Sequence, residues 1–283
     1  MSAHVEVRIR EEPVAGTPLL SIVTVCRNSA RHIGEMLRSV DEPFGREACV
    51  EHLVVDGLST DDTVSVIQKF PHPRRRLVSD ADTGVYDGMN KGLHCARGEY
   101  VWFLNSDDLL HPEFASCATE LLRVLRERRP TILVGEVQMF KETPSGRRPT
   151  RYWRVPAHVE QARRFGWHPP HPAFIARRRF LIGLGGFDET KRIAADFKLM
   201  TLAMRSANGE VEIIARPLVA MREGGVSNGS VRAIVDANRE CYAALREIGL
   251  SPARAAAGIG VKLARKASQK FVSARPSPAT GSR

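Results

Sequence analysis

The chain contains 283 residues, of which 43% are hydrophobic and 26% are charged, proportions typical of a globular protein with an apolar core. The formal net charge of +10 indicates an anionic partner, but the basic runs 74–76 and 177–179 lack interleaved aromatic residues, so we expect no nucleic-acid partner. No apolar run approaches the ~20 residues of a membrane span, and the five scattered cysteines fit neither a disulfide framework nor a zinc site.

The first half of the chain alternates between apolar strand patterns and amphipathic helix patterns. After a polar arm over residues 1–18, we expect buried strands at 19–25, 51–55, 76–79 and 100–104. This alternation predicts an α/β fold, a mostly parallel central sheet flanked by helices, in one domain over residues 19–230. The carboxyl ends of such strands share one edge of the sheet, where open α/β sheets bind ligands.

Acidic residues follow these strands. Asp56 ends the second strand, Asp82 follows the third, and Asp107 and Asp108 follow the fourth. Adjacent carboxylates beside a buried strand are costly unless a cation is near. Oxygen ligands of this kind suit Mg²⁺ or Mn²⁺, which in turn bind substrate phosphates. The pattern predicts a metal–diphosphate site, with helix capping by Asp107 or Asp108 as the alternative.

The second half of the chain is less regular. We expect a fifth strand over 131–139, a loop over 142–150, and an irregular segment over 151–172 that contains Trp167 and His171. Aromatic residues in such a segment are candidate platforms for sugar stacking, or else core packing. Further along, Asp196 lies among apolar residues, where it is a candidate general base or a helix N-cap.

The last part of the sequence, residues 231–283, predicts C-terminal helices and a basic tail. Over 252–272 small apolar residues oppose lysine and arginine, a pattern typical of helices that lie on an anionic membrane surface. The alternative is a solvated helix that packs its apolar face on the domain. Because the sequence has no apolar run long enough for a membrane span, we expect a cytoplasmic protein. The basic helix adds peripheral attachment to the inner face of the cytoplasmic membrane as a second option. From residue 273 onward the composition predicts disorder.

Four sequence motifs occur in a familiar order: SIVTVCRN (21–28), VVDGLSTD (54–61), DTGVYDGMNKG (82–92) and LNSDD (104–108). Together they resemble family 2 glycosyltransferases of the GT-A fold, in particular small bacterial members of colanic acid and phenolic glycolipid assembly. The resemblance covers about residues 19–230 and is specific for the family, not for the sugar. It implies a metal-dependent, inverting transfer of a sugar from a nucleotide-diphosphate donor to a hydroxyl of a glycan or lipid-linked acceptor, using Mn²⁺ or Mg²⁺.

The resemblance also implies a role for individual positions. Asp107 would hold the metal with support from Asp108, and Asp196 would deprotonate the acceptor hydroxyl. Asn105 replaces the first acid of the family's D-x-D motif, so it adds a hydrogen bond but no charge. The residues implied in binding the nucleotide sugar are Thr24, Arg27, Asp56, Asp82, Asn90, Lys91, Asn105 and Ser106. Those implied near the diphosphate and the acceptor are Trp167, His171, Gly224, Gly225 and Ser227.

Two other functions stay open from the sequence. Asn105 is also compatible with a degenerate nucleotide-sugar-binding module of weak catalytic activity at the membrane surface. A nucleotidyltransferase would likewise place acids at strand ends for a metal and a nucleotide. That class normally has a glycine- and lysine-rich phosphate loop after the first strand, which the residues 26–29 do not form.

Overall fold

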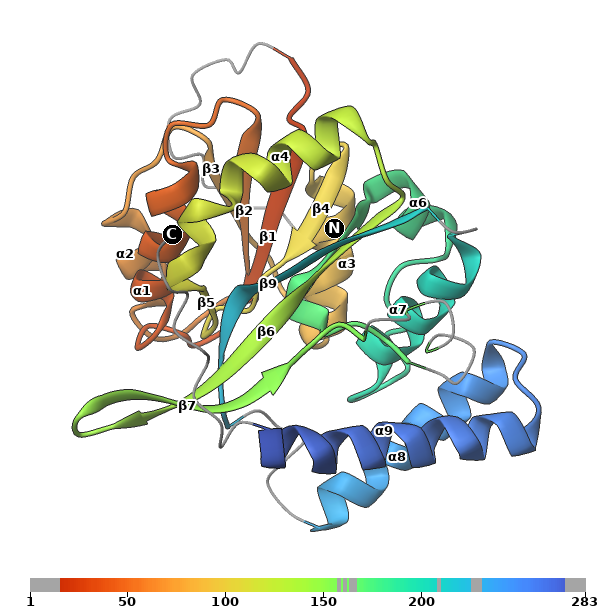
Figure 1. The fold of residues 1–283 in the computed structure, drawn as a ribbon. Helices are drawn as coiled ribbons and strands as arrows, with labels where there is room; N and C mark the ends of the chain where they lie inside the picture. The colour runs from red at the N-terminus through yellow and green to blue at the C-terminus, as the bar shows by residue number, and fades with distance from the viewer. Residues whose placement is uncertain are drawn as a thin grey trace, which may run out of the picture.

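The computed structural model describes residues 16–156, 159, 162, 167–207, 210–224 and 231–272. Most of the predicted N-terminal arm and the predicted disordered tail lie outside these residues. Within the described part, a nine-stranded sheet runs through the centre of the molecule, with helices on both faces (Figure 1). Its strand order is β3-β2-β1-β4-β8-β6-β9-β5, and β7 pairs with β6.

The first half of the sheet is parallel, as predicted. It consists of β1 (Leu20–Cys26), β2 (Val50–Asp56), β3 (Arg75–Ser79) and β4 (Tyr100–Phe103). Nearly every residue of these strands is buried, because helices cover both faces. In the register, Cys26 lies opposite Asp56, and Asp56 lies opposite Ser79. Three strands therefore end at the same level of one edge.

The second half of the sheet is mixed. Here β8 (Phe174–Arg177) runs antiparallel between β4 and β6 (Ile132–Thr143). On the other side of β6, β9 (Val211–Arg222) is parallel to it and carries the short β5 (Leu109–Leu110). The predicted α/β fold with a mostly parallel central sheet and flanking helices is confirmed.

Two hydrophobic cores lie on the two faces of the sheet. One is formed with α1 (Ile33–Phe44), α2 (Thr63–Gln68), the 3-10 helix η1 (Pro112–Ser116) and α4 (Ala118–Glu127). The other is formed with α3 (Val85–Cys95), α6 (Arg178–Gly183) and α7 (Ala195–Ser206). A second 3-10 helix, η2 (His171–Ala173), leads into β8. The apolar residues of α1 keep the helical spacing that predicted this helix.

The prediction of a loop over residues 142–150 is wrong. Strand β6 continues to Thr143, and β7 (Gly146–Trp153) returns along it as a hairpin that projects from the body of the protein (Figure 1). Gly146 has a φ of +110°, a left-handed value that favours glycine in the turn. Pro149 suggested a loop, but it is tolerated because β7 lies at an edge, where a missing N–H breaks no central ladder.

The predicted C-terminal helices are α8 (Val231–Glu247) and α9 (Pro252–Val272). They pack on α7 through a third apolar cluster that includes Phe197, Cys241, Leu245, Leu250 and Ala255. Figure 1 shows the pair lying beneath the β6–β7 side of the sheet. None of the helices in the described residues combines the length and the apolar character needed to cross a bilayer. The predicted end of the glycosyltransferase-like domain at residue 230 stays a prediction.

Close packing of α3 on β1 gives a test of the fold. A Cβ atom on Gly92 would lie 2.4 Å from Cγ1 of Val23 in the sheet, whereas Gly260 in α9 has no heavy atom within 4 Å of that position. We expect Gly92→Ala to lower the free energy of unfolding by about 1–3 kcal/mol, because overpacking outweighs the gain in helix propensity. The matched Gly260→Ala should raise it by about 0.5–1 kcal/mol. Urea denaturation measures both, and equal effects of the two substitutions would contradict the packing.

Candidate active site

The loops that follow β1 and β2 are locked together at the carboxyl edge of the sheet. The backbone N–H of Asn28 donates to Ser59 Oγ at 2.8 Å, and the N–H of Thr60 donates to Asn28 Oδ1 at 2.8 Å. Asn28 and Leu58 both have a φ of +51°, the left-handed region that non-glycine residues seldom adopt. Strained residues of this kind concentrate at functional sites. Two of the three described non-glycine residues with positive φ thus lie at this edge, and one of them, the exposed Leu58, was not predicted from the sequence.

The loop after β4 joins the same assembly. Ser106 Oγ and Ser29 Oγ share a hydrogen bond of 2.9 Å across the loops after β4 and β1. Arg27, from the loop after β1, extends its guanidinium to 3.8 Å from a carboxylate oxygen of Asp82 after β3. Contacts between side chains thus connect all four strand ends, as the parallel topology predicted.

Asp56 is completely buried at the end of β2. Its carboxylate accepts hydrogen bonds from Ser59 N–H at 3.1 Å and from Ser79 Oγ at 2.8 Å, in addition to the Ser59 hydroxyl. A buried carboxylate must find such donors because it has lost water. Asp56 therefore ties β2, β3 and the following loop together at the predicted nucleotide site.

Asp82 is almost buried, with 5% of its side chain exposed, and it lies against the backbone of Gly57. A Cβ atom at position 57 would approach within 2.0 Å of an Asp82 carboxylate oxygen, so any larger residue there would displace the Asp82 side chain. Burial raises the pKa of Asp82, and the nearby positive charge of Arg27 opposes that rise. Lys91 lies behind the same loop, where its Nζ donates to the carbonyl of Ala81 and pairs with Asp80 at 3.5 Å.

The Asn105–Asp108 segment separates its two acids. Asp107 is half-buried, whereas Asp108 is fully buried and accepts hydrogen bonds from Asn105 Nδ2 at 2.8 Å and from the backbone N–H of Arg222 at 3.1 Å. Burial, reinforced by the adjacent charge of Asp107, raises the pKa of Asp108 to about 7. Both carboxylate oxygens of Asp108 are thus already engaged within the protein, which leaves Asp107 as the acid suited to a metal.

Arg222, at the end of β9, was not singled out by the sequence. Its Nε donates to the backbone carbonyl of Asp107 at 3.3 Å, and its Nη2 lies 3.3 Å from Glu35 on α1. Glu142 and Arg147 of the β6–β7 hairpin complete this ion-pair network. No local motif marks Arg222, because its partners come from three separate parts of the chain.

Two predicted donor-binding residues have internal roles. Thr24 is fully buried, and its hydroxyl hydrogen-bonds His52 Nε2 at 3.1 Å within the sheet, so it does not reach the site. Asn90 uses its side-chain amide to exchange hydrogen bonds of 2.8 Å with the backbone of Phe187. Thr24 faces α1, where its hydroxyl also contacts Met36 Sδ, whereas the donor contact implied for half-buried Asn90 stays a prediction.

Asp196 lies in the first turn of α7 and lines a cavity of about 250 Å³. Its Oδ1 accepts a hydrogen bond from the N–H of Phe197 at 2.7 Å and faces the Tyr86 hydroxyl at 3.4 Å. Trp167 and His171 line the same cavity, so the structure brings these three predicted residues together. Gly224 follows β9 with a φ of +137°, while Gly225 and Ser227 lie outside the described residues.

The positions of the acidic side chains limit how a metal ion could be bound. In the residues described, no three His, Cys, Asp or Glu side chains form a cluster able to hold a metal alone. Mg²⁺ in phosphate-transfer sites is commonly bound by one or two carboxylates together with substrate phosphates. Half-buried Asp107 therefore suits a cation that arrives with a diphosphate rather than one caged by protein ligands.

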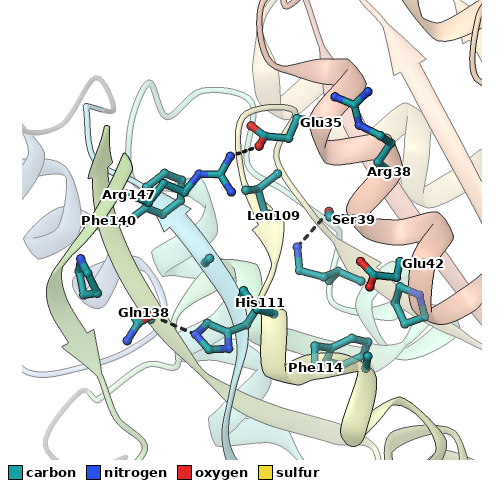
Figure 2. A pocket seen from close by; sticks show the side chains of 16 residues that line it. Glu35, Arg38, Ser39, Glu42, Leu109, His111, Phe114, Gln138, Phe140 and Arg147 are labelled. Carbon is teal, nitrogen blue, oxygen red and sulfur yellow. Dashed lines mark hydrogen bonds and ion pairs between the residues drawn. The ribbon is translucent and has the colours of Figure 1, made fainter. Parts of the chain in front are cut away.

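A larger cavity of about 470 Å³ lies elsewhere, between α1, η1 and the β6–β7 hairpin (Figure 2). Arg147 pairs with Glu35 across its mouth, and His111 Nε2 lies 3.0 Å from Gln138 Oε1 on its wall. None of the residues predicted from the sequence lines this cavity. Its size alone therefore does not make it the candidate site.

Comparison with solved structures identifies the fold. Staphylococcus aureus TarS (residues 1–349, in complex with UDP-GlcNAc) superposes with a TM-score of 0.61 at 19% identity, covering 89% of this chain and 74% of that one. The mannosyltransferase PcManGT from Pyrobaculum calidifontis, in complex with GDP-Man and Mn²⁺, gives a TM-score of 0.58 at 21% identity, with 95% and 78% coverage. The GT-A fold that the resemblance implied is confirmed.

Sequence comparison gives the family. The model of the family described as Glycosyl transferase family 2 matches residues 21–182, and the chain belongs to this family. Succinoglycan biosynthesis protein ExoO of Rhizobium meliloti (strain 1021) is 30% identical over 227 residues, which are 74% of this chain and 63% of that protein. A PGL/p-HBAD biosynthesis glycosyltransferase of Mycobacterium bovis (strain BCG / Pasteur 1173P2) is 31% identical over 186 residues, 64% of this chain and 67% of the relative.

His168, another residue lining the cavity, gives a pH-dependent prediction. Burial, together with the charge of Lys262, lowers its pKa to about 4, although Asp196 acts in the opposite direction. The unfolded chain then binds more protons between pH 6.5 and 4, so stability falls as the pH falls through this window. Between pH 7 and pH 4.5, we expect this residue to lower the free energy of unfolding of the wild type by about 2 kcal/mol. Because His168→Phe has no titrating ring at this position, its free energy of unfolding should fall by about 2 kcal/mol less over the same pH range. Urea denaturation at pH 7 and pH 4.5 measures the difference, and identical pH dependence would contradict it.

Proposed function

We propose that the protein is a metal-dependent, inverting glycosyltransferase that transfers a sugar from a nucleotide-diphosphate donor to a hydroxyl of a glycan or lipid-linked acceptor. Its role would lie in the synthesis of cell-surface polysaccharide or glycolipid, as the names of its relatives suggest. The proposal rests on one observation. Hydrogen bonds and an ion pair join the loops that carry Asp56, Asp82 and Asp107 at one edge of the sheet. The cavity with Asp196 supplies a place for the acceptor.

In this proposal the donor lies across the ends of β1 to β4. Asp82 and the exposed Arg27 are the side chains positioned to contact the nucleoside, and buried Asp56 holds the loop on which they depend. Asp107 would hold Mn²⁺ or Mg²⁺, and the cation would neutralise the charge that develops on the leaving diphosphate. Asn105, Asp108 and Arg222 keep the Asp107 loop in place.

Asp196 would act as the general base. The acceptor hydroxyl would lose its proton to the Asp196 carboxylate while its oxygen forms the new bond to the anomeric carbon, on the face opposite the departing diphosphate. Tyr86 and the N–H of Phe197, which face the carboxylate, would keep it oriented. Such a single displacement inverts the anomeric centre and needs no covalent enzyme intermediate.

Asn105 bears on the two alternatives. A degenerate module would have lost a useful acid at this position, but here the amide of Asn105 donates to buried Asp108, which an aspartate could not do when ionised. The substitution therefore has a structural reason in an active enzyme. Membership of family 2 disfavours the nucleotidyltransferase.

Metal binding can be tested at Asp107. We expect wild type to bind UDP, GDP or dTDP more tightly when Mn²⁺ is present, because the cation links the diphosphate to the carboxylate. Asp107→Asn should weaken the Mn²⁺-dependent part of nucleotide affinity at least about tenfold, by analogy with other metal-site losses. Exposed Asp62 lies on the neighbouring loop, so Asp62→Asn is the matched control and should change nothing. Calorimetric titration gives both affinities; nucleotide binding indifferent to Mn²⁺ would favour the degenerate module.

The catalytic role of Asp196 has a separate test. We expect Asp196→Asn to reduce turnover by about 10²–10⁴-fold with nucleotide affinity nearly intact, because a general base acts in the transition state. The assay follows nucleoside diphosphate release from a panel of nucleotide sugars, with a bacterial membrane-lipid extract as acceptor. Asp188→Asn serves as the structural control, because it removes an ion pair to Lys198, which lies on α7 as Asp196 does. Equal loss of nucleotide binding in Asp196→Asn would indicate a structural acid.

A further inference from the structure

Helix α9 packs with part of its basic side turned toward the protein. One of the two alternatives from the sequence placed the small apolar residues against the domain, but Ala257 and Ala264 are exposed. Lys262, Arg265 and Lys266 are instead half-buried and line the cavity that contains Asp196. The membrane contact predicted for residues 252–272 stays a prediction, and these three cations belong to the wall of the cavity.

Cationic side chains outnumber acidic ones among the described residues that line the cavity. Arg151 on β7 and the three cations of α9 line it, whereas Asp196 is the only carboxylate among the described lining residues. The other titratable groups of the wall contribute no compensating negative charge. Burial lowers the pKa values of His168 and His171, and it raises the pKa of the Cys241 thiol, which therefore stays protonated.

The nearest partners of Lys262 are neutral. Its Nζ lies 3.3 Å from Asn238 Oδ1 and 2.9 Å from Cys241 Sγ, and it sits 5.2 Å from the ring centre of Phe197. Among the described residues, the hydrogen-bond partners of this half-buried ammonium group are neutral, so its lost hydration is not replaced by a direct ion pair at those atoms. Such an arrangement costs stability in the free protein, which is typical of a group placed for a ligand.

Arg151 of β7 also lines the cavity and, in the described part of the chain, has an unsatisfied donor. Its guanidinium stacks over Trp153 with 5.3 Å between Cζ and the ring centre. Within the described residues, its buried Nε has no hydrogen-bond partner, and neither has either ring nitrogen of His171. The charge of Glu223 acts on Arg151, but Glu223 is not part of the cavity wall. In the part of the chain that the structure describes, Arg151 Nε and the ring nitrogens of His171 are thus buried polar atoms of the cavity wall without a hydrogen-bond partner.

We propose that the acceptor carries an anionic group, a carboxylate or a phosphate, which binds Lys262 and Arg151 while its reacting hydroxyl lies at Asp196. This inference rests on the proposed function, because it assigns the cavity to the acceptor. Charge-assisted hydrogen bonds to such a group are about twice as strong as neutral ones, so the cavity would discriminate against neutral sugars. Helix α9 would thus help to determine acceptor specificity from outside the residues matched by the family.

Small anions test the proposal directly. Glucuronate, glucose 1-phosphate and neutral glucose are titrated into the full-length protein in the presence of saturating UDP and Mg²⁺, so that the donor site is filled. Tryptophan fluorescence reports binding, because Trp153 and Trp167 line the cavity while Trp102 is buried in the sheet. We expect saturable binding of glucuronate or glucose 1-phosphate and none of glucose over the same range. The first two probes distinguish a carboxylate from a phosphate as the preferred group.

Variants of α9 give the decisive comparison. Lys262→Gln should weaken anion binding at least about tenfold, whereas Lys262→Arg should retain it. Arg254 is exposed on the same helix and does not line the cavity, so Arg254→Gln should bind the anions as wild type does. Circular dichroism and UDP affinity confirm that each variant is folded.

Other outcomes would overturn the proposal. Equal binding of glucose and glucuronate, or unchanged anion binding in Lys262→Gln, would show that the cavity does not select charge. Loss of adsorption to phosphatidylglycerol vesicles in Lys262→Gln, without any small-anion binding in wild type, would assign the cation to a lipid surface instead. The protein could also bind anions in a way that depends on Lys262 and yet fail to bind nucleotide. That result would refute the proposed donor site but not the assignment of the cavity to an anionic ligand.

Discussion

The site depends on one buried carboxylate, that of Asp108. Its burial is costly, and the structure offsets the cost with the side-chain amide of Asn105 and the backbone N–H of Arg222. The bond from Asn105 closes the loop after β4 on itself, and the bond from Arg222 attaches that loop to the end of β9, more than 100 residues away in the sequence. Because Asp108 holds the loop from within, Asp107 is left at its surface. The replacement of an acid by Asn105 is then a requirement of the loop, since a second ionised carboxylate could not donate to Asp108.

The two parts of the candidate site carry opposite charges. Asp56, Asp82 and Asp107 place negative charge at the sheet edge, where a divalent cation and a diphosphate would balance it. The cavity under α9 is instead lined by cations, with Asp196 as the acid among them. Such a separation would keep an anionic acceptor away from the acidic edge until the donor and its metal are bound. The C-terminal helices, which lie beyond the region matched by the family, supply most of that positive charge.

Much of the fold could be predicted because it follows from local patterns. Continuous apolar strands and helices with 3.6-residue spacing gave the βα units, and parallel strands must bring Asp56, Asp82 and Asp107 to the same edge. The errors fall where local pattern is ambiguous. Pro149 and Gly146 indicated a loop but belong to an edge hairpin, and Thr24 belongs to a matching motif but faces inward. Register and packing, which involve distant residues, decide the direction of a side chain.

The sequence by itself determined the α/β class, the family and the position of the acids at strand ends, because these depend on periodicity and on the order of motifs. Only the tertiary structure decided which acid is buried and which is accessible, since Asp107 and Asp108 are adjacent and chemically identical in the sequence. It also decided that Lys262 faces a cavity rather than solvent. An amphipathic helix has two faces, and the surface on which it packs selects the buried one.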